Sequence, residues 1–277
     1  MNPVQKALWY VESHFADEIS LDEIASAGGA SRFYLTRAFG VATGQSLMRY
    51  VRGRRLTEAA RSLASGAPDI LTVALDAGYH SHEAFTRAFT EHFGSTPEAV
   101  RAQGHVANLK LVEAIRMDQS MLETLQPPRF VNGKPLLVAG VAQRYTCEDS
   151  AGIPAQWQRF LPHFGHIPGQ SGNVAYGVMY NADDEGNFEY LCGAEVSDFA
   201  RVPAELARLR VPEQRYVVFT HPGHVSEIRR TWNTVWNKWF PESGHEVADG
   251  PYFERYGEDF DPQTGAGSIE LWIPIRR

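Results

Sequence analysis

The sequence predicts two domains of different class: an all-α domain with two helix-turn-helix units, followed by an α+β domain with a duplicated strand–helix–strand–strand order. The chain has 277 residues, enough for two domains with their own cores. Apolar residues keep a helical period from Val4 to about Arg101. Short β-rich runs with two helical segments among them follow the Gln126-Pro127-Pro128 stop. We expect the domains at 1–104 and 122–277, joined by a linker at 105–121.

The first domain contains clear signals for helix starts and stops. Ser20 followed by Glu23 is the pattern of a capping box, which predicts a short helix from there. The glycine pair at 28–29 ends it, and Ser31 can cap the next helix, expected over 32–39. A helix, a short glycine-bearing turn and a second helix are the components of a helix-turn-helix.

One segment of this domain occurs twice. Residues 31–39 read Ser-Arg-Phe-Tyr-Leu-Thr-Arg-Ala-Phe, and residues 81–89 read Ser-His-Glu-Ala-Phe-Thr-Arg-Ala-Phe. Gly44 corresponds in the same way to Gly94. Such repeats indicate duplicated structural units, so we expect two helix-turn-helix units. The repeated Leu or Phe positions have the spacing of a buried helix face.

Charge is distributed unevenly along the chain. The total of 26 basic and 33 acidic residues gives a net charge of −7, which excludes a nonspecific basic coat for nucleic acid. The stretch from Arg32 to Arg61, however, has seven arginines and a single acid, Glu58. Arginines supply the phosphate contacts that dominate DNA affinity. The alternative for such a run is a solvated helix face; beside a duplicated helix-turn-helix, DNA is the favoured interpretation.

The stretch 70–101 contains a family pattern. The residues that carry it are Val73-Ala74, Gly78-Tyr79, Ser81, Phe85-Thr86-Arg87-Ala88-Phe89, Phe93-Gly94 and Thr96-Pro97. This pattern resembles the signature of the AraC/XylS family of bacterial transcription regulators, and the resemblance covers about residues 4–103. In that family a long helix, here expected at about 47–64, joins two units whose recognition helices enter adjacent major grooves of DNA. The resemblance implies double-stranded promoter DNA as a partner, and RNA polymerase as a further one.

The same resemblance implies which side chains face the DNA. In the first recognition helix they are Arg32, Phe33, Thr36 and Arg37; in the second they are Ser81, His82, Glu83, Thr86 and Arg87. An arginine can bind guanine through two hydrogen bonds, a glutamate can accept one from cytosine, and apolar groups can contact the thymine methyl. For Arg37 and Arg87, a phosphate contact is the alternative to a base contact.

The second domain is expected to contain a duplicated sheet. The β-rich runs are 136–145, 174–180, 188–196, 216–220, 252–256 and 269–275, and the helical segments are about 154–163 and 225–240. In chain order they give strand–helix–strand–strand twice. We therefore expect an α+β sheet with a groove between its halves.

Several short sequence segments of this domain form a second family pattern. They are His221-Pro222-Gly223-His224 before a helix with Trp232, Trp236 and Trp239, then Gly250-Pro251-Tyr252-Phe253-Glu254-Arg255-Tyr256, then Ile269-Glu270-Leu271-Trp272-Ile273-Pro274-Ile275. The pattern resembles the GyrI-like effector-binding domain, over about residues 122–277. That resemblance implies a drug-like ligand, often cationic and aromatic, bound between the two halves, with an acidic residue at the position of Glu270 in the pocket.

Strand alternation is compatible with a pocket at Glu270. It puts Glu270 and Trp272 together on one face, and a carboxylate beside an indole suits an organic cation. Trp232 and Tyr176 are further candidates for ligand binding, whereas Trp236 and Trp239 are assigned to the core. The alternative for Glu270 is an exposed acid on an edge strand, because Pro274 is typical of an edge or a strand end.

Other chemistry has no supporting motif. His163 with His166 and His221 with His224 have short spacings but no third ligand, so no metal is expected, and no cofactor. Phosphate-loop, nucleophile-elbow and dinucleotide motifs are missing, and no catalytic residue is assigned. Two cysteines are too few for a disulfide framework. The longest apolar run, 136–142, is too short for a membrane span, and the first residues lack a signal-peptide core, so a cytoplasmic protein is expected.

These observations predict a ligand-responsive bacterial transcription regulator that is not an enzyme, and the family resemblance implies an activator rather than a repressor. Two alternatives come from other classes. The first is a GyrI-like hydrolase or drug-binding protein that uses Glu270 and Tyr176, with the DNA-binding half localising or autoregulating it. The second is a ligand-independent DNA-binding protein with a C-terminal interaction module.

Overall fold

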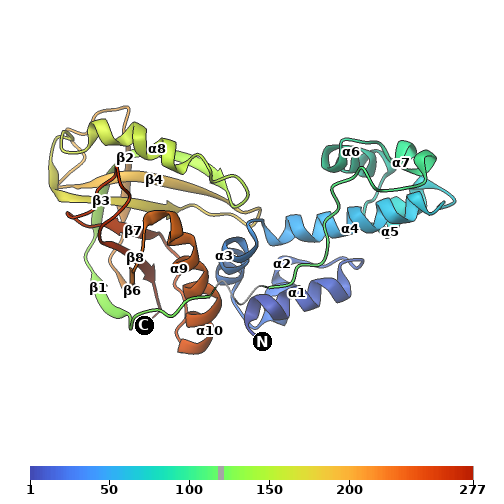
Figure 1. Cartoon of the computed structure of the whole chain (residues 1–277), viewed down its shortest axis with the longest axis horizontal. Coiled ribbons are helices and arrows are strands. Elements are labelled where there is room, and N and C mark those ends of the chain that lie inside the picture. The colour runs from blue at the N-terminus through green and yellow to red at the C-terminus, as the bar shows by residue number, and fades with distance from the viewer. Residues whose placement is uncertain (118–121, 277) are drawn as a thin grey trace. The chain divides into compact units, whose positions relative to one another are not determined.

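The computed structural model describes residues 1–117 and 122–276, which form two compact units (Figure 1). The first unit comprises Met1–Leu35 and Ser46–Met117, and the second comprises Thr36–Gln45 and the described residues 122–276. The division differs from the expected domains in two respects. Residues 105–117 of the expected linker belong to the first unit, and a short piece of the helical region, 36–45, belongs to the second. Linker residues 118–121 lie outside the described residues.

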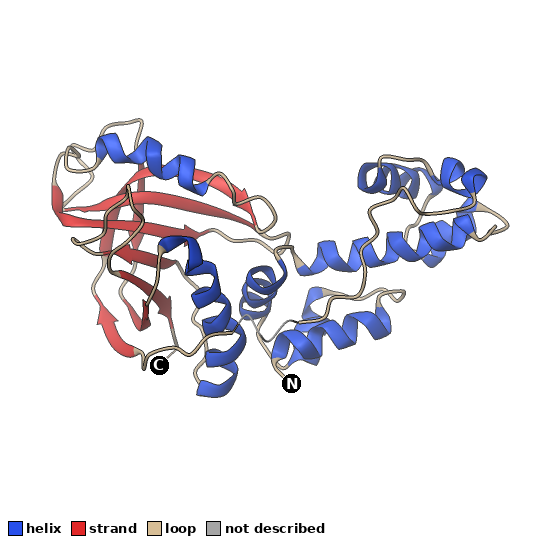
Figure 2. Ribbon diagram, in the orientation of Figure 1, coloured by secondary structure: helices blue, strands red, loops and turns tan. Residues whose placement is uncertain are grey.

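The helical region has the expected elements (Figure 2). Its helices are α1 (Pro3–His14), α2 (Leu21–Gly28), α3 (Arg32–Thr43), α4 (Leu47–Ala64), α5 (Ile70–Asp76), α6 (His82–Phe93) and α7 (Pro97–Gln103). The pairs α2–α3 and α5–α6 are the two helix-turn-helix units, and α4 is the joining helix at its predicted position. Helix α3 extends beyond the expected end at 39, and Gly44 follows it with φ of +74°, a conformation that favours glycine.

The caps read from the sequence are present. The Ser20 hydroxyl accepts a hydrogen bond from the Glu23 amide at 3.3 Å, and the Glu23 carboxylate accepts one from the Ser20 amide at 2.7 Å. The Ser31 hydroxyl accepts from the Tyr34 amide at 3.2 Å. Each bond satisfies an amide that has no partner within its helix. The capping box therefore fixes where α2 begins, and Ser31 fixes where α3 begins.

The second helix-turn-helix encloses its own core. Phe85 and Phe89 of α6 are fully buried, as are Leu56 and Leu63 of α4. Leu109, from the segment after α7, packs against the same cluster, so this segment belongs to the first unit and is not a free linker. Burying aromatic side chains of this size supplies a large part of a small domain's stability.

The second unit contains an antiparallel sheet whose order, within residues 122–276, is β1-β6-β8-β7-β3-β4-β2-β5. The strands are β1 (Arg129–Gly133), β2 (Leu136–Thr146), β3 (Gln170–Tyr180), β4 (Asn187–Val196), β5 (Ala207–Val211), β6 (Gln214–His221), β7 (Tyr252–Tyr256) and β8 (Ile269–Pro274). The predicted order occurs twice, as β2-α8-β3-β4 and β6-α9-β7-β8, and the two halves meet where β3 pairs with β7. The short edge strands β1 and β5 were not predicted.

Helices from both halves cover one face of the sheet (Figure 2). Helix α8 (Ile153–Phe160) is fixed to the sheet by Gln156, whose amide group donates to the carbonyls of Val141 and Tyr190, each at 2.8 Å. The other half carries α9 (Ile228–Thr234), a π-helical turn η4 (Val235–Trp239) and α10 (Phe240–Ser243). Trp236 of η4 is fully buried, as predicted, and also lines the cavity described below, whereas Trp239, likewise assigned to the core, is only half-buried. No helix in the described part of the chain is long and apolar enough to span a membrane.

Candidate functional site

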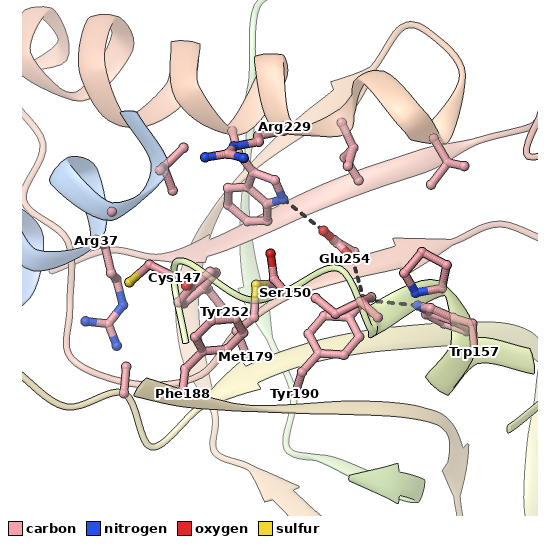
Figure 3. A pocket seen from close by; sticks show the side chains of 18 of the residues that line it. Arg37, Cys147, Ser150, Trp157, Met179, Phe188, Tyr190, Arg229, Tyr252 and Glu254 are labelled. Carbon is pink, nitrogen blue, oxygen red and sulfur yellow. Dashed lines mark hydrogen bonds between the residues drawn. The ribbon is translucent and has the colours of Figure 1, made fainter. Parts of the chain in front are cut away.

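The second unit contains a cavity of about 490 Å³ between its helices and the sheet (Figure 3). Its walls come from α8, α9 and the segments before them, from β3, β4 and β7, and from the 36–41 part of α3. The size is that of a pocket for a drug-like molecule. Most of the lining is apolar or aromatic, so the few charged groups at the walls decide which ligands it can hold.

Glu254 is the buried carboxylate of this cavity. It lies on β7, is 6% exposed, and accepts hydrogen bonds from Tyr190 at 2.7 Å, Tyr256 at 2.9 Å and Trp232 at 2.9 Å. Burial raises the pKa of Glu254 above its ordinary value, although the three donors act in the opposite direction. The carboxylate is therefore held in place by neutral donors, without a basic side chain among them.

The surroundings of Glu254 are aromatic. Trp157 of α8 donates to the Tyr190 hydroxyl at 3.2 Å and packs edge-to-face on Tyr256, with 4.8 Å between ring centroids. A β-carbon at Gly177 would lie 2.0 Å from the Tyr190 hydroxyl oxygen, so only glycine leaves room for the Tyr190–Glu254 bond. A carboxylate among ring faces in an apolar cavity can stabilise an organic cation by charge and by cation–π attraction.

The opposite end of the cavity is basic. Arg37 and Arg229 lie there with Cys147 (Figure 3), and the Arg37 guanidinium stacks over the ring of Tyr252 at 5.4 Å. Burial lowers the pKa of Arg37 from its ordinary value. Burial also raises the pKa of the Cys147 thiol, which keeps it protonated and weakly nucleophilic.

One of the four predicted ligand residues lies in the cavity wall and three do not. Trp232 lines the cavity, but Glu270, Trp272 and Tyr176 do not. The register explains why: Glu254 pairs with Leu271 across the sheet, so the side chain of Glu270, one residue earlier, points to the opposite face. The pocket carboxylate is thus Glu254 instead of Glu270.

Glu270 is already paired on that opposite face. Its carboxylate forms an ion pair with Arg129 and another with Arg255 at 3.4 Å, and it accepts a hydrogen bond from Trp272 at 3.0 Å. The sequence offered a signal for Glu254 that the prediction did not use. Glu254 lies between Tyr252 and Tyr256 at strand spacing, which puts an acid and two aromatic rings on one face.

The second recognition helix presents its predicted residues at its surface. Exposed or half-buried in α6 and its cap are Ser81, His82, Glu83, Thr86 and Arg87. The imidazole Nε2 of His82 lies 3.4 Å from a carboxylate oxygen of Glu98. The side chains that face inward from this helix are the fully buried Phe85 and Phe89.

The first recognition helix differs. Arg32 is exposed and pairs with Asp22 at 3.1 Å, and Phe33 is half-buried. Thr36 and Arg37 are 6% and 9% exposed, and both belong to the second unit, where they line the cavity. Arg32 and Phe33 are therefore at a surface, whereas Thr36 and Arg37 are not.

Several arginines of the basic stretch 32–61 have structural partners. Arg54 is buried and pairs with Glu12 at 3.0 Å, and Arg55 donates to the carbonyls of Phe15, at 2.5 Å, and Asp17. Arg61 forms two ion pairs, both at 2.6 Å, with Glu58 and Glu113. The positive excess of this stretch is therefore partly used to hold the first unit together.

His221, from one of the two histidine pairs, is held by hydrogen bonds within the second unit. His221 lies 2.8 Å from the Thr231 hydroxyl and 2.9 Å from the His224 carbonyl, so both ring nitrogens have partners. Across residues 1–117 and 122–276, no group of three or more histidine, cysteine, aspartate or glutamate residues is arranged to hold a metal ion.

Comparison with known proteins agrees with this architecture. Residues 24–103 match the helix-turn-helix domain family, and residues 126–276 match the GyrI-like small-molecule-binding domain family. Together the two define a DNA-binding regulator with a domain for small molecules. The chain belongs to the AraC-type transcription regulators that carry a GyrI-like domain.

Full-length relatives share this domain order. The transcriptional regulator Rob of Salmonella typhimurium is 30% identical over 99% of this chain and 98% of its own length. The right origin-binding protein of Escherichia coli K12 is 28% identical over the same shares. Among solved structures, that of SAV2435 bound to tetraphenylphosphonium is 18% identical, with a TM-score of 0.47, over 55% of this chain and 94% of that one.

Proposed function

We propose that this regulator activates transcription from promoter DNA in response to an aromatic organic cation bound around Glu254. The observation that carries the proposal is a single buried carboxylate, held by three neutral donors, at the wall of an apolar cavity of about 490 Å³. A buried carboxylate without a basic partner is costly, and a bound cation would supply the missing charge.

Calorimetry with two ions of one shape tests the cation preference. Tetraphenylphosphonium is an aromatic monocation without a titratable group, and tetraphenylborate has the same four rings with the opposite charge. We expect the phosphonium to bind with a micromolar dissociation constant and the borate to bind at least about tenfold more weakly, a difference of ~1.4 kcal/mol. Equal affinities would mean that the cavity selects for apolar surface and not for charge.

The affinity for tetraphenylphosphonium is expected to rise with pH. Burial raises the pKa of Glu254, so part of the carboxyl is protonated below that pKa, and the cation favours the ionised form. Proton release should accompany binding in that range. Tyr190 and Tyr256 do not interfere, because burial raises their pKa values far from neutrality. His221, Tyr252 and Cys192 also interact electrostatically with Glu254. Calorimetry in buffers of different ionisation enthalpy measures the released protons; a pH-independent affinity would contradict the role of Glu254.

DNA reading is assigned to α6 and to the exposed start of α3. Arg87 of α6 is exposed and can bind a guanine or a phosphate. Arg87→Ala is expected to weaken binding to a duplex selected from a random pool by about tenfold, in line with ~1–3 kcal/mol for a specific arginine contact. Gel-shift titration measures the loss. Arg276→Ala removes the same charge from an exposed ion pair of the second unit and serves as the control. Equal losses of DNA affinity in both variants would mean that Arg87 acts only through the net charge of the protein and makes no specific contact.

Activation further requires a productive encounter with RNA polymerase. We expect transcription in vitro from a promoter carrying the selected site to rise when tetraphenylphosphonium is added. The hydrolase alternative placed its chemistry on Glu270 and Tyr176, which lie on the sheet face away from the cavity. The cavity therefore contains neither of the two groups on which that chemistry would depend.

A further inference from the structure

Part of the first recognition helix is a wall of the cavity. Residues 36–45 belong to the same compact unit as the sheet, and the Arg37 guanidinium lies over the Tyr252 ring (Figure 3). At the next residue of α3, the Ala38 carbonyl accepts a hydrogen bond from the Asn237 side chain at 3.1 Å. Gly40 lies against Cys147, where a β-carbon would be 3.1 Å from the sulfur. These contacts hold α3 at three positions, 37, 38 and 40, against the sheet-containing unit.

The sequence repeat supplies an internal comparison for this burial. Thr36 and Arg37 correspond to Thr86 and Arg87, since the two nine-residue segments begin at Ser31 and Ser81. Arg87 is exposed and Thr86 is half-buried, whereas Arg37 and Thr36 are buried. The two arginines at matching positions of matching helices thus have opposite exposure, whereas the two threonines differ less, because both of their hydroxyl oxygens are buried. The difference comes from the cavity contacts of α3 and not from the helix-turn-helix itself.

We propose that Arg37 serves two sites in turn: it closes the empty cavity, and it contacts DNA when a cation occupies the cavity. This inference rests on the proposed function, because it requires a cationic effector. While Arg37 and Thr36 line the cavity they are unable to contact base edges, so DNA binding through α3 and the closed cavity exclude each other.

Charge decides the direction of the coupling. The cavity already holds the Arg37 guanidinium in a poorly solvated place, where its charged form is disfavoured by burial. A second positive charge in the same apolar space repels it more strongly than it would in water. A bound cation therefore disfavours the position in which Arg37 lines the cavity. Bound DNA disfavours the same position, because Arg37 must leave the cavity wall to contact phosphates or bases. Because both ligands favour the same released state, each must increase the affinity of the other by the same factor.

A disulfide tests the placement of α3 directly. A β-carbon at position 40 would lie 3.5 Å from the β-carbon of Cys147, within the separation that a disulfide spans. Gly40→Cys in the full chain is therefore expected to cross-link with the native Cys147 under mild oxidation. The double variant with Cys147→Ser, and Gly40→Ser alone, are the controls that are unable to cross-link.

The cross-linked protein is expected to bind the selected duplex at least about fivefold more weakly than the same protein after reduction, the lower end of ordinary coupling. Added tetraphenylphosphonium should raise the DNA affinity of the reduced protein but not of the cross-linked one. Failure of the cross-link to form would overturn the placement of α3, and equal DNA affinities before and after reduction would overturn the exclusion.

Arg37→Gln gives a second measurement that does not depend on the cysteine. We expect this variant to bind tetraphenylphosphonium severalfold more tightly than the wild type, because a repelling charge is gone. It should also lose the coupling between the phosphonium and DNA. Arg87→Gln, the matching change in α6, should weaken DNA binding yet retain the coupling factor.

The outcomes separate this inference from the proposed function. If the wild type binds tetraphenylphosphonium through Glu254 but Arg37→Gln binds it no better and keeps the coupling, the cation site stands and the role of Arg37 is rejected. If the wild type does not bind the phosphonium at all, the proposed effector class fails. In that case the disulfide still decides whether α3 closes the cavity.

Discussion

Glu254→Gln is expected to weaken the binding of tetraphenylphosphonium by about 100-fold, or ~2.7 kcal/mol. The substitution keeps the size of the side chain and removes the charge that the cation would meet in an apolar cavity. Tyr190, Tyr256 and Trp232 donate to this carboxylate and supply no charge of their own, so nothing in that cluster replaces it. Calorimetric titration of the full chain measures the loss.

Glu270→Gln is the matched control. It makes the same change on the adjacent strand but on the opposite face, where Glu270 pairs with Arg129 and Arg255. We expect its phosphonium affinity to equal that of the wild type. The pair of variants thus separates the carboxylate found in the structure from the one predicted from sequence; the reverse pattern would return the site to Glu270.

The thermal stability of Glu254→Gln shows whether weaker binding in this variant results from lost charge or from impaired folding. Because burial raises the pKa of Glu254 in the folded protein, the folded chain binds more protons than the unfolded one between the two pKa values. The contribution of Glu254 to the free energy of unfolding is therefore largest at pH values below its pKa in the unfolded chain. It decreases as the pH rises through its pKa in the folded chain. Glutamine does not ionise, so at pH 7.5 the variant should melt no lower than the wild type, as measured by calorimetry. A lower melting temperature would mean that lost folding, and not lost charge, explains weak binding.

The site shows where strand patterns are informative and where they are not. Alternation along 269–275 correctly separates Glu270 and Trp272 from Leu271. A period of two says which residues share a face, but it does not say which face the helices cover. That depends on where α8 and α9 pack, which is set by contacts such as Gln156 with the carbonyls of β2 and β4. The prediction therefore found a paired acid and missed the pocket acid.

Helices and strands could be predicted where the local sequence pattern was strong. The strand 252–256 and the helix 47–64 have their predicted bounds. The strand was predicted from a β-rich run, and the helix from the family resemblance together with its apolar spacing. The edge strands β1 and β5 have only five residues each. β1 is mostly exposed, whereas in β5 Ala207, Leu209 and Val211 pack against the core and alternate with two arginines, a short strand signal that the prediction did not use. The assignment of 36–45 to the second unit rests on contacts made by residues more than 100 positions away.

The arginine run is a comparable case of distant partners. By count, 32–61 is a basic stretch, and the sequence gives no sign that Glu12 is the partner of Arg54, 42 residues along the chain. The Arg54 guanidinium binds both oxygens of that carboxylate and also donates to the Val112 carbonyl at 3.0 Å. The Tyr50 hydroxyl donates to the same carboxylate at 2.5 Å. This network joins α1, α4 and the segment after α7.

Arg54→Ala is expected to lower the free energy of unfolding of the first unit by about 3 kcal/mol, because it leaves the partly buried Glu12 carboxylate without its charge partner. Urea unfolding of the full chain, followed by circular dichroism at the helix band, measures the change. Arg61→Ala removes an equal charge from ion pairs that are far more exposed, and it should cost less than about 1 kcal/mol.

DNA binding by the same two variants decides between a structural and a phosphate-binding role for Arg54. At a temperature where both remain folded, Arg54→Ala should bind the selected duplex with nearly the affinity and salt dependence of the wild type, since its guanidinium is 8% exposed and turned toward Glu12. A phosphate contact would instead reduce the slope of log affinity against log salt by about one while leaving stability intact. A stable Arg54→Ala with that reduced slope would return Arg54 to the DNA-binding surface, and the structural network would then have no energetic role.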